Sequence, residues 1–168
     1  MPDKETLERA KKDKREGKAP TTQAGEFVRE EIEHIREGKH GARSTQQAIA
    51  IGLSKARRAG VDLPPPKKGT TSTKTRRSAQ RAYEAGQKGK KKASNTRSRA
   101  VTKALKREPR STVSKRALAK QAHRAATQRT RSDRSAAARK AVRTKGAAGR
   151  SAAARKAART RARKRTAS

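Results

Sequence analysis

Hydrophobic positions in the first third of the chain recur with helical spacing. Val28, Ile32 and Ile35 follow one another at offsets of four and three residues, and Phe27 stands beside Val28. This period gathers the four side chains on one side of an α-helix. Gly38 favours the left-handed backbone that commonly ends a helix. The pattern therefore predicts an amphipathic helix that Gly38 and Gly41 end.

A second helix is predicted soon after the first. Ser44 can cap it with its hydroxyl, and Gln47 can reach back three residues, as in a capping box. Gly60 provides a left-handed stop, so the helix should run to about Ala59. Its small and aliphatic residues are Ala48, Ile49, Ile51, Gly52, Leu53 and Ala56. Because prolines follow in an extended conformation, the two helices should form a hairpin with an extended exit.

The rest of the chain is far more polar than the helical hairpin at residues 21–62. Residues 1–20 alternate positive and negative charges, which suits a solvated segment that can form a helix held by local ion pairs, without an assigned function. A linker rich in Pro, Lys and Thr spans 63–74, and a basic low-complexity tail occupies 75–168. The predicted fold class is mostly α plus disorder, a small two-helix hairpin followed by a long, Ala/Lys/Arg-rich tail of isolated or induced helices.

The hairpin is small for an independent domain. Domains of about 40 residues usually need disulfides, metals or oligomerisation to fold. The chain contains no cysteine. We therefore expect self-association through the hairpin.

The tail contains one internal repeat. Residues 134–144 read RSAAARKAVRT and residues 150–160 read RSAAARKAART, identical at ten of eleven positions. Ala and Arg are strong helix formers, but like charges four residues apart repel each other, and short helices are marginal in water. We therefore expect the tail to be disordered alone and helical on a polyanion.

Capping and helix-breaking residues predict where the tail helices begin and end. Asp133 or Ser135 should start one helix, and Gly146 and Gly149 should break it. A second helix should start at Ser151. Weaker helical stretches are predicted at 75–85, 97–107 and 112–128.

Charge divides the chain more sharply than hydrophobicity does. The sequence holds 49 Lys and Arg against 14 Asp and Glu, a formal charge of +35. Residues 1–40 hold ten of each sign, so residues 41–168 carry the whole excess. Only 29% of residues are hydrophobic and 1% aromatic. A cationic tail of this density calls for an anionic partner, and a phosphate backbone fits it best.

The tail cations are the predicted nucleic-acid-binding residues. Contacts to phosphates hold a protein on DNA without reading bases, and they act by releasing counterions. The predicted function is therefore sequence-nonspecific DNA binding, with DNA coating or compaction as in histone-like, nucleoid-associated proteins. The residues expected to neutralise phosphates are Lys90, Lys91, Lys92, Arg139, Lys140, Arg143, Arg155, Lys156, Arg159 and Arg163.

Duplex DNA is favoured over other polyanions. Single-strand binders stack bases on aromatic rings, and this chain has one Phe, one Tyr and no Trp. An arginine-rich segment can also fold on structured RNA, so the alternative is a structural RNA-binding or ribosome-associated protein. No membrane partner is expected, since the face opposite the charges is mostly alanine.

No catalytic, metal or cofactor site is predicted. Glu30, Glu31, Glu33 and Glu37 are interpreted as the polar face of a helix, because the chain offers no pocket to shift a carboxyl pKa. No cysteine accompanies His34, His40 or His123, so exposed, solvated histidines are expected. No glycine-rich loop has the Gly-Lys-Ser/Thr ending of a nucleotide hydrolase. The chain is therefore predicted not to be an enzyme.

The sequence shows no secretory or membrane-spanning pattern. Its first residues lack the apolar stretch of a secretory signal, and no run of about 18 apolar residues occurs. We expect a soluble, intracellular protein, associated with the nucleoid if its source is bacterial.

Two motifs of the hairpin resemble a known family. EFVREEIEHIREGKH and QQAIAIGLSKARRAG, within about residues 24–66, resemble an uncharacterised small helical domain of basic bacterial proteins. In that family an Ala commonly stands at Gly52 and an acidic residue at Lys55, so this chain departs at both positions. The resemblance implies a compact helical unit and no known activity.

The tail resembles the tails of linker histones and of bacterial linker-histone-like nucleoid proteins. The resemblance lies in the Ala, Lys and Arg bias and the short repeats, and it covers about 100 residues. The tail lacks the Ser-Pro and Thr-Pro pairs of linker-histone tails and the Arg-Gly-Arg-Pro core of minor-groove hooks. The resemblance therefore implies DNA binding without indicating which groove is contacted.

Overall fold

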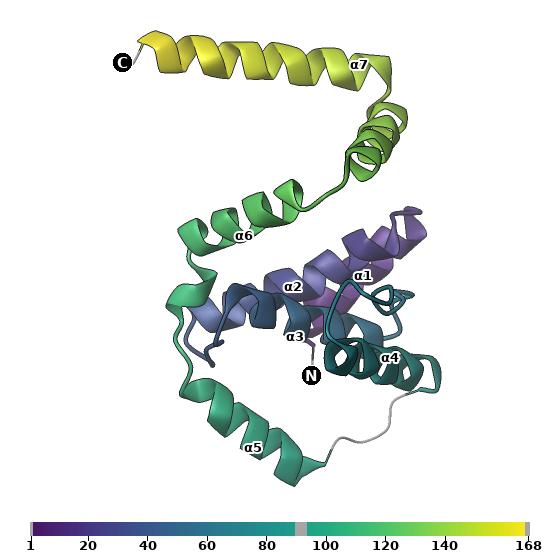
Figure 1. Ribbon diagram of the computed structural model, residues 1–168, viewed down its shortest axis with the longest axis vertical. Helices are drawn as coiled ribbons and strands as arrows, with labels where there is room; N and C mark the ends of the chain where they lie inside the picture. Colours follow the sequence, from purple (N-terminus) through teal and green to yellow (C-terminus); the bar gives the residue numbers. More distant parts are fainter. Residues whose placement is uncertain (1, 90–93, 167–168) are drawn as a thin grey trace. The chain divides into compact units, whose positions relative to one another are not determined.

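The chain forms a series of α-helices (Figure 1). The computed structural model describes residues 2–89 and 94–166, and no strand occurs within these ranges. The chain divides into two compact units, Met1–Ala122 and His123–Ser168. The helices are α1 (Lys4–Arg15), α2 (Pro20–Arg36), α3 (Thr45–Arg58), α4 (Thr73–Gln87), α5 (Asn95–Lys106), the 3-10 helix η1 (Ser111–Val113), α6 (Lys115–Thr127) and α7 (Arg131–Thr166). The prediction of an α protein is confirmed.

The predicted disorder of the tail is wrong for its described residues. Helices α4 to α7 occupy most of residues 73–166. Alanine loses the least conformational entropy in a helix, and arginine ranks close behind it. The local preference for helix in this composition therefore outweighs the repulsion between like charges.

The core of the first unit lies between α1, α2 and α3. Its largest buried side chain is Phe27 of α2, which is 1% exposed. Ala10 of α1, Ala56 of α3 and Leu63 beyond α3 belong to the same apolar cluster. Since small residues surround the single aromatic ring, the helices can approach closely despite the low hydrophobic content.

The predicted two-helix hairpin is only the centre of a larger unit, and the interpretation of residues 1–20 as a solvated segment is wrong. Helix α1 packs on α2, where Thr6 and Ala10 are buried and Arg9 pairs with Glu26 at 2.7 Å. Helix α4 packs on α3 through its buried residues Ala79 and Ala82. A buried side made of alanine and threonine is weakly apolar, so hydrophobic periodicity did not reveal it.

A second apolar cluster joins α2 and α3 to a segment more than 60 residues away in sequence. Val113 of η1 is fully buried against Ile35, Ala42 and Ala48. The Arg36 guanidinium donates hydrogen bonds to the Val113 carbonyl at 3.2 and 3.3 Å. Residues near 113, predicted as tail, therefore belong to the packed unit.

Gly52 sets how closely α2 and α3 approach. A Cβ atom built on Gly52 would lie 2.7 Å from Val28 Cα and 3.0 Å from the Phe27 carbonyl oxygen. Real Cβ atoms do not come this close to backbone. The departure from the alanine of the resembling family therefore has a packing reason in this chain.

The predicted ends of the hairpin helices are confirmed. Ser44 Oγ accepts a hydrogen bond from the Gln47 amide at 3.1 Å. The Gln47 side chain reaches back to accept from the Arg43 amide at 2.7 Å. Gly38 and Gly60 adopt φ of 81° and 88°, whereas Gly41, also predicted to end the first helix, has no positive φ and lies beyond the helix end. Local hydrogen bonds and glycine backbone freedom decide these positions, so they could be found without tertiary information.

The chain leaving α3 is held to the core instead of forming a free linker from residue 63. Arg57, buried at 7% exposure, donates from Nε to the Leu63 carbonyl at 3.0 Å and from Nη2 to the Pro64 carbonyl at 3.3 Å. Tyr83 of α4 donates to Asp62 at 2.7 Å. These bonds explain why α4 returns to pack on α3.

Helix α7 belongs to the second unit and consists of two straight parts. Gly146 has φ 62° and ψ −178°, which breaks the helical path. Gly149, predicted as a second break, lies within the helix. The helix begins earlier than predicted, because Thr130 Oγ1 accepts from the Asp133 amide at 3.1 Å and Asp133 accepts from the Thr130 amide at 3.3 Å. This reciprocal cap outweighs a start at Ser135.

Candidate nucleic-acid interface and a buried acid–base cluster

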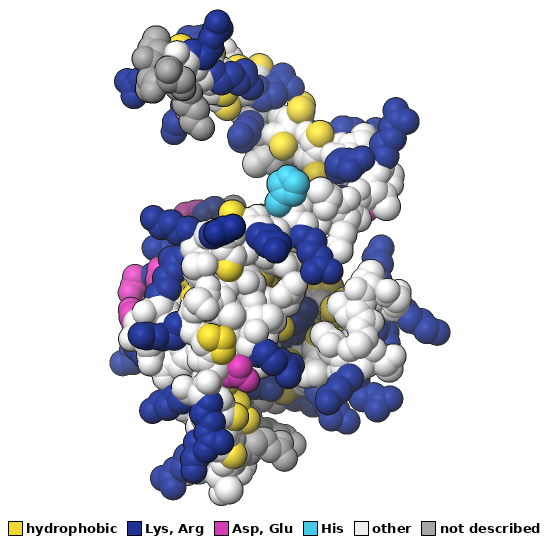
Figure 2. Space-filling model, turned by 60° about the vertical axis from the view of Figure 1, so that its left-hand side comes forward, with side chains coloured by type: hydrophobic (Ala, Val, Ile, Leu, Met, Phe, Trp, Pro, Cys, Tyr) yellow, Lys and Arg dark blue, Asp and Glu magenta, His cyan; other side chains and the backbone are white. Residues whose placement is uncertain are grey.

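The predicted phosphate-binding residues of the repeat lie on both parts of α7. Arg139, Lys140 and Arg143 precede the break at Gly146, and Arg155, Lys156, Arg159 and Arg163 follow it. All seven side chains are exposed. Figure 2 shows Lys and Arg side chains projecting over much of the visible surface. Lys90, Lys91 and Lys92 lie outside the described residues.

The two copies of the repeat adopt the same local structure. Arg139 donates to Ser135 Oγ at 3.1 Å, and Arg155 donates to Ser151 Oγ at the same distance. Thr144 donates to the Lys140 carbonyl at 2.9 Å, and its counterpart Thr160 does so to Lys156 at 3.0 Å. The corresponding cations of the two repeat copies therefore have the same helical backbone and the same local hydrogen bonds.

Arg155, Arg159 and Arg163 share one side of the second part of α7. Residues four apart are neighbours on a helix surface, about 6 Å apart along the axis. Residues 131–163 and residue 165 of α7 are exposed, apart from partly buried Gly149. Its helicity therefore comes from propensity and capping, and no core sequesters its cations.

Helix α5 carries a basic row that was not among the predicted site residues. Arg99, Lys103 and Lys106 fall at offsets of four and three residues, so they face one way. Together with neighbouring polar residues they line a shallow hollow. The helical spacing of these three cations in the sequence could have indicated this row. The cations of the repeat at 134–144 and 150–160 are more regularly spaced and were predicted in their place.

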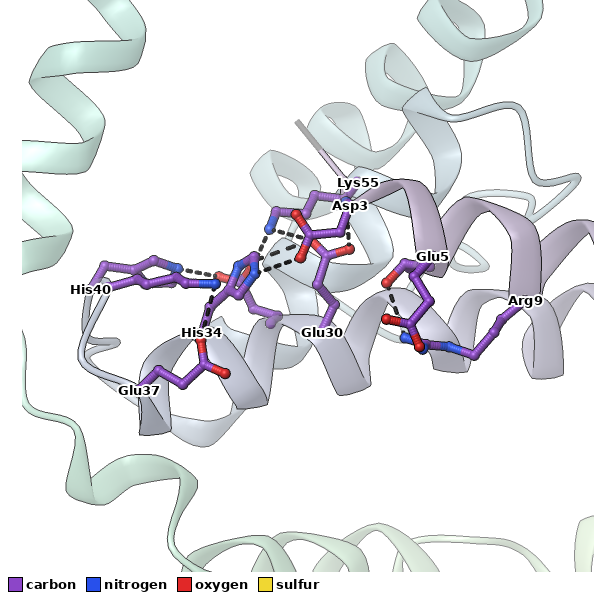
Figure 3. Close-up of polar contacts among 11 residues, drawn as sticks. Asp3, Glu5, Arg9, Glu30, His34, Glu37, His40 and Lys55 are labelled. Atoms are coloured by element: carbon purple, nitrogen blue, oxygen red, sulfur yellow. Dashed lines mark hydrogen bonds and ion pairs between the residues drawn. The ribbon is translucent and has the colours of Figure 1, made fainter.

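A buried acid–base cluster lies where α1, α2 and α3 meet (Figure 3). Glu30 and Glu31 of α2 are 2% and 0% exposed. Lys55 of α3 lies 3.1 Å from Glu30 Oε1 and 2.7 Å from Glu31 Oε2. Burial opposes the charged ammonium, but these ion pairs outweigh it and raise the pKa of Lys55. The interpretation of Glu30 and Glu31 as a polar helix face is therefore wrong.

Two of the three histidines belong to this cluster, so the expectation of exposed, solvated histidines is wrong for them. The side chains of His34 and His40 are 13% and 14% exposed. His34 Nε2 lies 3.1 Å from Asp3 Oδ2. His40 Nε2 lies 3.3 Å from Glu31 Oε1. The turn at Gly38 folds the chain back over the end of α2, which brings His40 to His34.

The position of Asp3 ties α1 to this cluster. Its backbone amide donates to Glu30 Oε2 at 3.1 Å. The hydrogen bond from His34 lowers the pKa of the Asp3 carboxyl, against the opposing effect of burial. The indication in sequence was the pairing of Glu31 with His34 three residues later, since residues at this spacing share a helix face. The contribution of α1 and α3 could not be read from it.

Comparisons with known proteins give one partial match. Residues 11–68 match the model of a family of unknown function (DUF6496). The match covers part of α1, all of α2 and α3 and the extended exit, and leaves α4 to α7 outside. No curated protein and no solved structure matches the chain. None of the described helices has the length and apolar character of a membrane span. The resemblance of the hairpin to an uncharacterised small domain is thus supported.

Proposed function

We propose that this protein binds duplex DNA without reading its sequence and coats or compacts it by neutralising phosphates. The observation that supports this most is the exposure of the seven predicted cations along α7. Structural cations in the first unit behave differently, because Arg9 and Lys55 pair with carboxylates. The seven cations of α7 are exposed on the helix surface, where an external polyanion can reach them.

The charge density of α7 suits a phosphate backbone. Residues 147–166 carry eight Lys and Arg and no Asp or Glu. As a helix this segment is about 30 Å long. Duplex DNA of that length presents about 18 phosphates, at one charge per 1.7 Å. One such helix can therefore neutralise roughly half of the charge it faces, and the first part of α7 adds a similar surface.

The break at Gly146 supports coating more than recognition of one site. Two basic helices joined by a glycine can change direction at the joint, and so follow a backbone that curves. Phosphate contacts carry no base information, so specificity is not expected. In this proposal the protein acts as nucleoid-associated proteins do, by covering DNA with distributed positive charge.

The proposal is tested by competition titration of the full chain on duplex DNA, single-stranded DNA and structured RNA at several salt concentrations. Tightest binding to the duplex and a steep fall of affinity with salt are expected. Tightest binding to structured RNA would replace the DNA proposal with an RNA-binding one. No binding at physiological salt would overturn both.

A matched pair of triple variants identifies the interface. Arg155→Gln, Arg159→Gln and Arg163→Gln together should lower the salt slope by about 2 to 3 and weaken binding roughly tenfold. Glutamine keeps a high helix propensity, so the helix should persist. Lys4→Gln, Lys11→Gln and Lys14→Gln, exposed on α1, change the net charge equally and should have a smaller effect. Equal effects would show that net charge alone governs binding.

A further inference from the structure

The buried acid–base cluster contains more negative than positive charge. Asp3, Glu30 and Glu31 contribute three carboxylates, and Lys55 contributes one ammonium close to them. Glu31 is fully buried, and neither of its oxygens accepts a hydrogen bond of good geometry. Burying a carboxylate costs several kcal/mol unless nearby charge and hydrogen bonds compensate it. The site therefore favours an additional positive species beside Glu31.

The hydrogen bond of His40 shows where that species would lie. His40 Nδ1 is 3.0 Å from the Gly41 carbonyl oxygen, which can only accept, so Nδ1 carries a proton. A neutral imidazole then presents a lone pair at Nε2, 3.3 Å from Glu31 Oε1. Two acceptors face each other at this distance. A cation placed between His40 Nε2 and Glu31 Oε1 would be bound by both atoms and would remove the repulsion between them.

His34 is oriented in an equivalent way. Its Nε2 lies 3.1 Å from Asp3 Oδ2, so the N–H donates to that carboxylate and Nδ1 keeps the lone pair. Each histidine thus has one ring nitrogen held by a carboxylate or a carbonyl and the other facing a buried glutamate, His34 Nδ1 at 3.9 Å from Glu30 Oε1 and His40 Nε2 at 3.3 Å from Glu31 Oε1. Histidines that ligate metals have this arrangement, in which the second partner fixes the tautomer and the ring orientation.

We propose that Glu31, His34 and His40 bind a divalent transition-metal ion, with Zn²⁺ the best fit. One ligand atom from each of the three lies within 4.8 Å of the others. Zinc bonds of about 2.0–2.1 Å place tetrahedral ligands about 3.4 Å apart. The 3.3 Å separation of Glu31 Oε1 and His40 Nε2 already matches this value. Two imidazoles and one carboxylate form a donor set that zinc prefers.

Lys55 determines how Glu31 would coordinate the metal. Its Nζ forms an ion pair with Glu31 Oε2 at 2.7 Å. Glu31 would therefore bind the ion through Oε1 alone. A second group of possible ligands, Asp3 and Glu30 with the same His34, also comes together. The first set is preferred because its carboxylate is fully buried and Glu31 Oε1 accepts no hydrogen bond of good geometry, whereas Asp3 is exposed. The fourth position of the metal would be taken by water.

The site is tested with the tag-free full chain, stripped with a chelator and titrated with Co²⁺ and then Zn²⁺ in the absence of nucleic acid. Co²⁺ should produce visible absorbance that saturates at one equivalent, and Zn²⁺ should abolish it. Zn²⁺ at a hundredfold excess over its dissociation constant should raise Tm by about 10 °C. If Co²⁺ gives no absorbance and Zn²⁺ no rise in Tm, the proposal fails.

Three substitutions assign the ligands. His40→Gln should weaken Co²⁺ binding by more than tenfold. Asp3→Asn, which removes only the partner of His34, should weaken it by about 10–100-fold. His123→Gln changes the remaining histidine, exposed on α6, and should leave the affinity unchanged. Equal losses for His40→Gln and His123→Gln would overturn the assignment.

Folding of the variants is checked separately. Circular dichroism and Tm of each metal-free variant show whether it retains the helical fold. Asp3→Asn is the more conservative test, since the Asp3 side chain does not cap α1. If folded Asp3→Asn and His40→Gln proteins bind Co²⁺ as tightly as the parent chain, the metal does not use this cluster and the proposal is wrong.

Discussion

Helices α3 and α7 show two ways in which one chain makes a helix. Helix α3 buries Ala48, Gly52 and Ala56 against its neighbours and is capped at Ser44. Helix α7 is more than twice as long and is exposed at almost every described residue. Tertiary packing stabilises the first, whereas local propensity and one capping pair stabilise the second.

The difference also separates the roles of charge. In the packed unit, cations such as Lys55 and Arg9 bind carboxylates of neighbouring helices and help to join them. On α7, the cations Lys140, Arg143 and Arg159 project into solvent. A helix that needs no core can devote its surface to a partner. In the proposed function, bound phosphates would stabilise this helix further by removing the repulsion between like charges.

The largest expected effect is the loss of the one buried aromatic ring. Phe27→Ala removes the centre of the first core and should lower the free energy of unfolding by about 3–5 kcal/mol. Val142→Ala, at a position 44% exposed on α7, should change it by less than about 0.5 kcal/mol. Denaturant unfolding followed by circular dichroism measures both. A similar cost at the two positions would contradict the contrast between packed and unpacked helices.

Glycine-to-alanine substitutions should have opposite effects on stability in α3, which is packed, and in α7, which is exposed. Gly52→Ala would place Cβ 2.7 Å from Val28 Cα, so we expect a loss of about 1–3 kcal/mol in the free energy of unfolding. Gly149→Ala has only Lys145 Cβ nearby, at 3.4 Å, and should favour the helix by about 0.5–1 kcal/mol. Unfolding midpoints report the first change, and helical circular dichroism reports the second. A stable Gly52→Ala protein would show that α2 and α3 can move apart.

The smallest expected effect concerns the bond that joins α4 to the exit of α3. The hydrogen bond to Asp62, assisted by burial and by the carboxylate charge, raises the pKa of Tyr83. This bond favours the protonated phenol, so its stabilising contribution is present below the ordinary tyrosine pKa of about 10 and is lost as pH rises through the raised pKa. Asp62→Asn should return the Tyr83 pKa toward its ordinary value.

The measurement is direct because Tyr83 is the only tyrosine and the chain has no tryptophan. Ultraviolet absorbance of the phenolate, recorded against pH, therefore reports this residue alone. Glu84→Gln, which changes a neighbouring carboxylate, is the control and should leave the titration in place. An unchanged titration in Asp62→Asn would show that α4 is not held at this point in solution.

Local features of the sequence were sufficient for the central hairpin. The cap at Ser44 and the stops at Gly38 and Gly60 depend on contacts within a few residues. Periodic apolar positions identified the side of α2 that carries Phe27 and Ile35. Helical propensity was underestimated for the tail, where repulsion between charges was given more weight than the preference of alanine for helix.

The sequence by itself determined the helical class, the hairpin ends, the neutral head and the exposed basic repeat, because all of these follow from local spacing and composition. Only the tertiary structure decided that α1, α4 and Val113 complete the packed unit, and that Asp3, His34, His40 and Lys55 meet around buried glutamates. Those contacts join positions up to 78 residues apart, as between Ile35 and Val113. Small buried side chains gave them no hydrophobic periodicity, and the distances between charged groups exist only after the helices have packed.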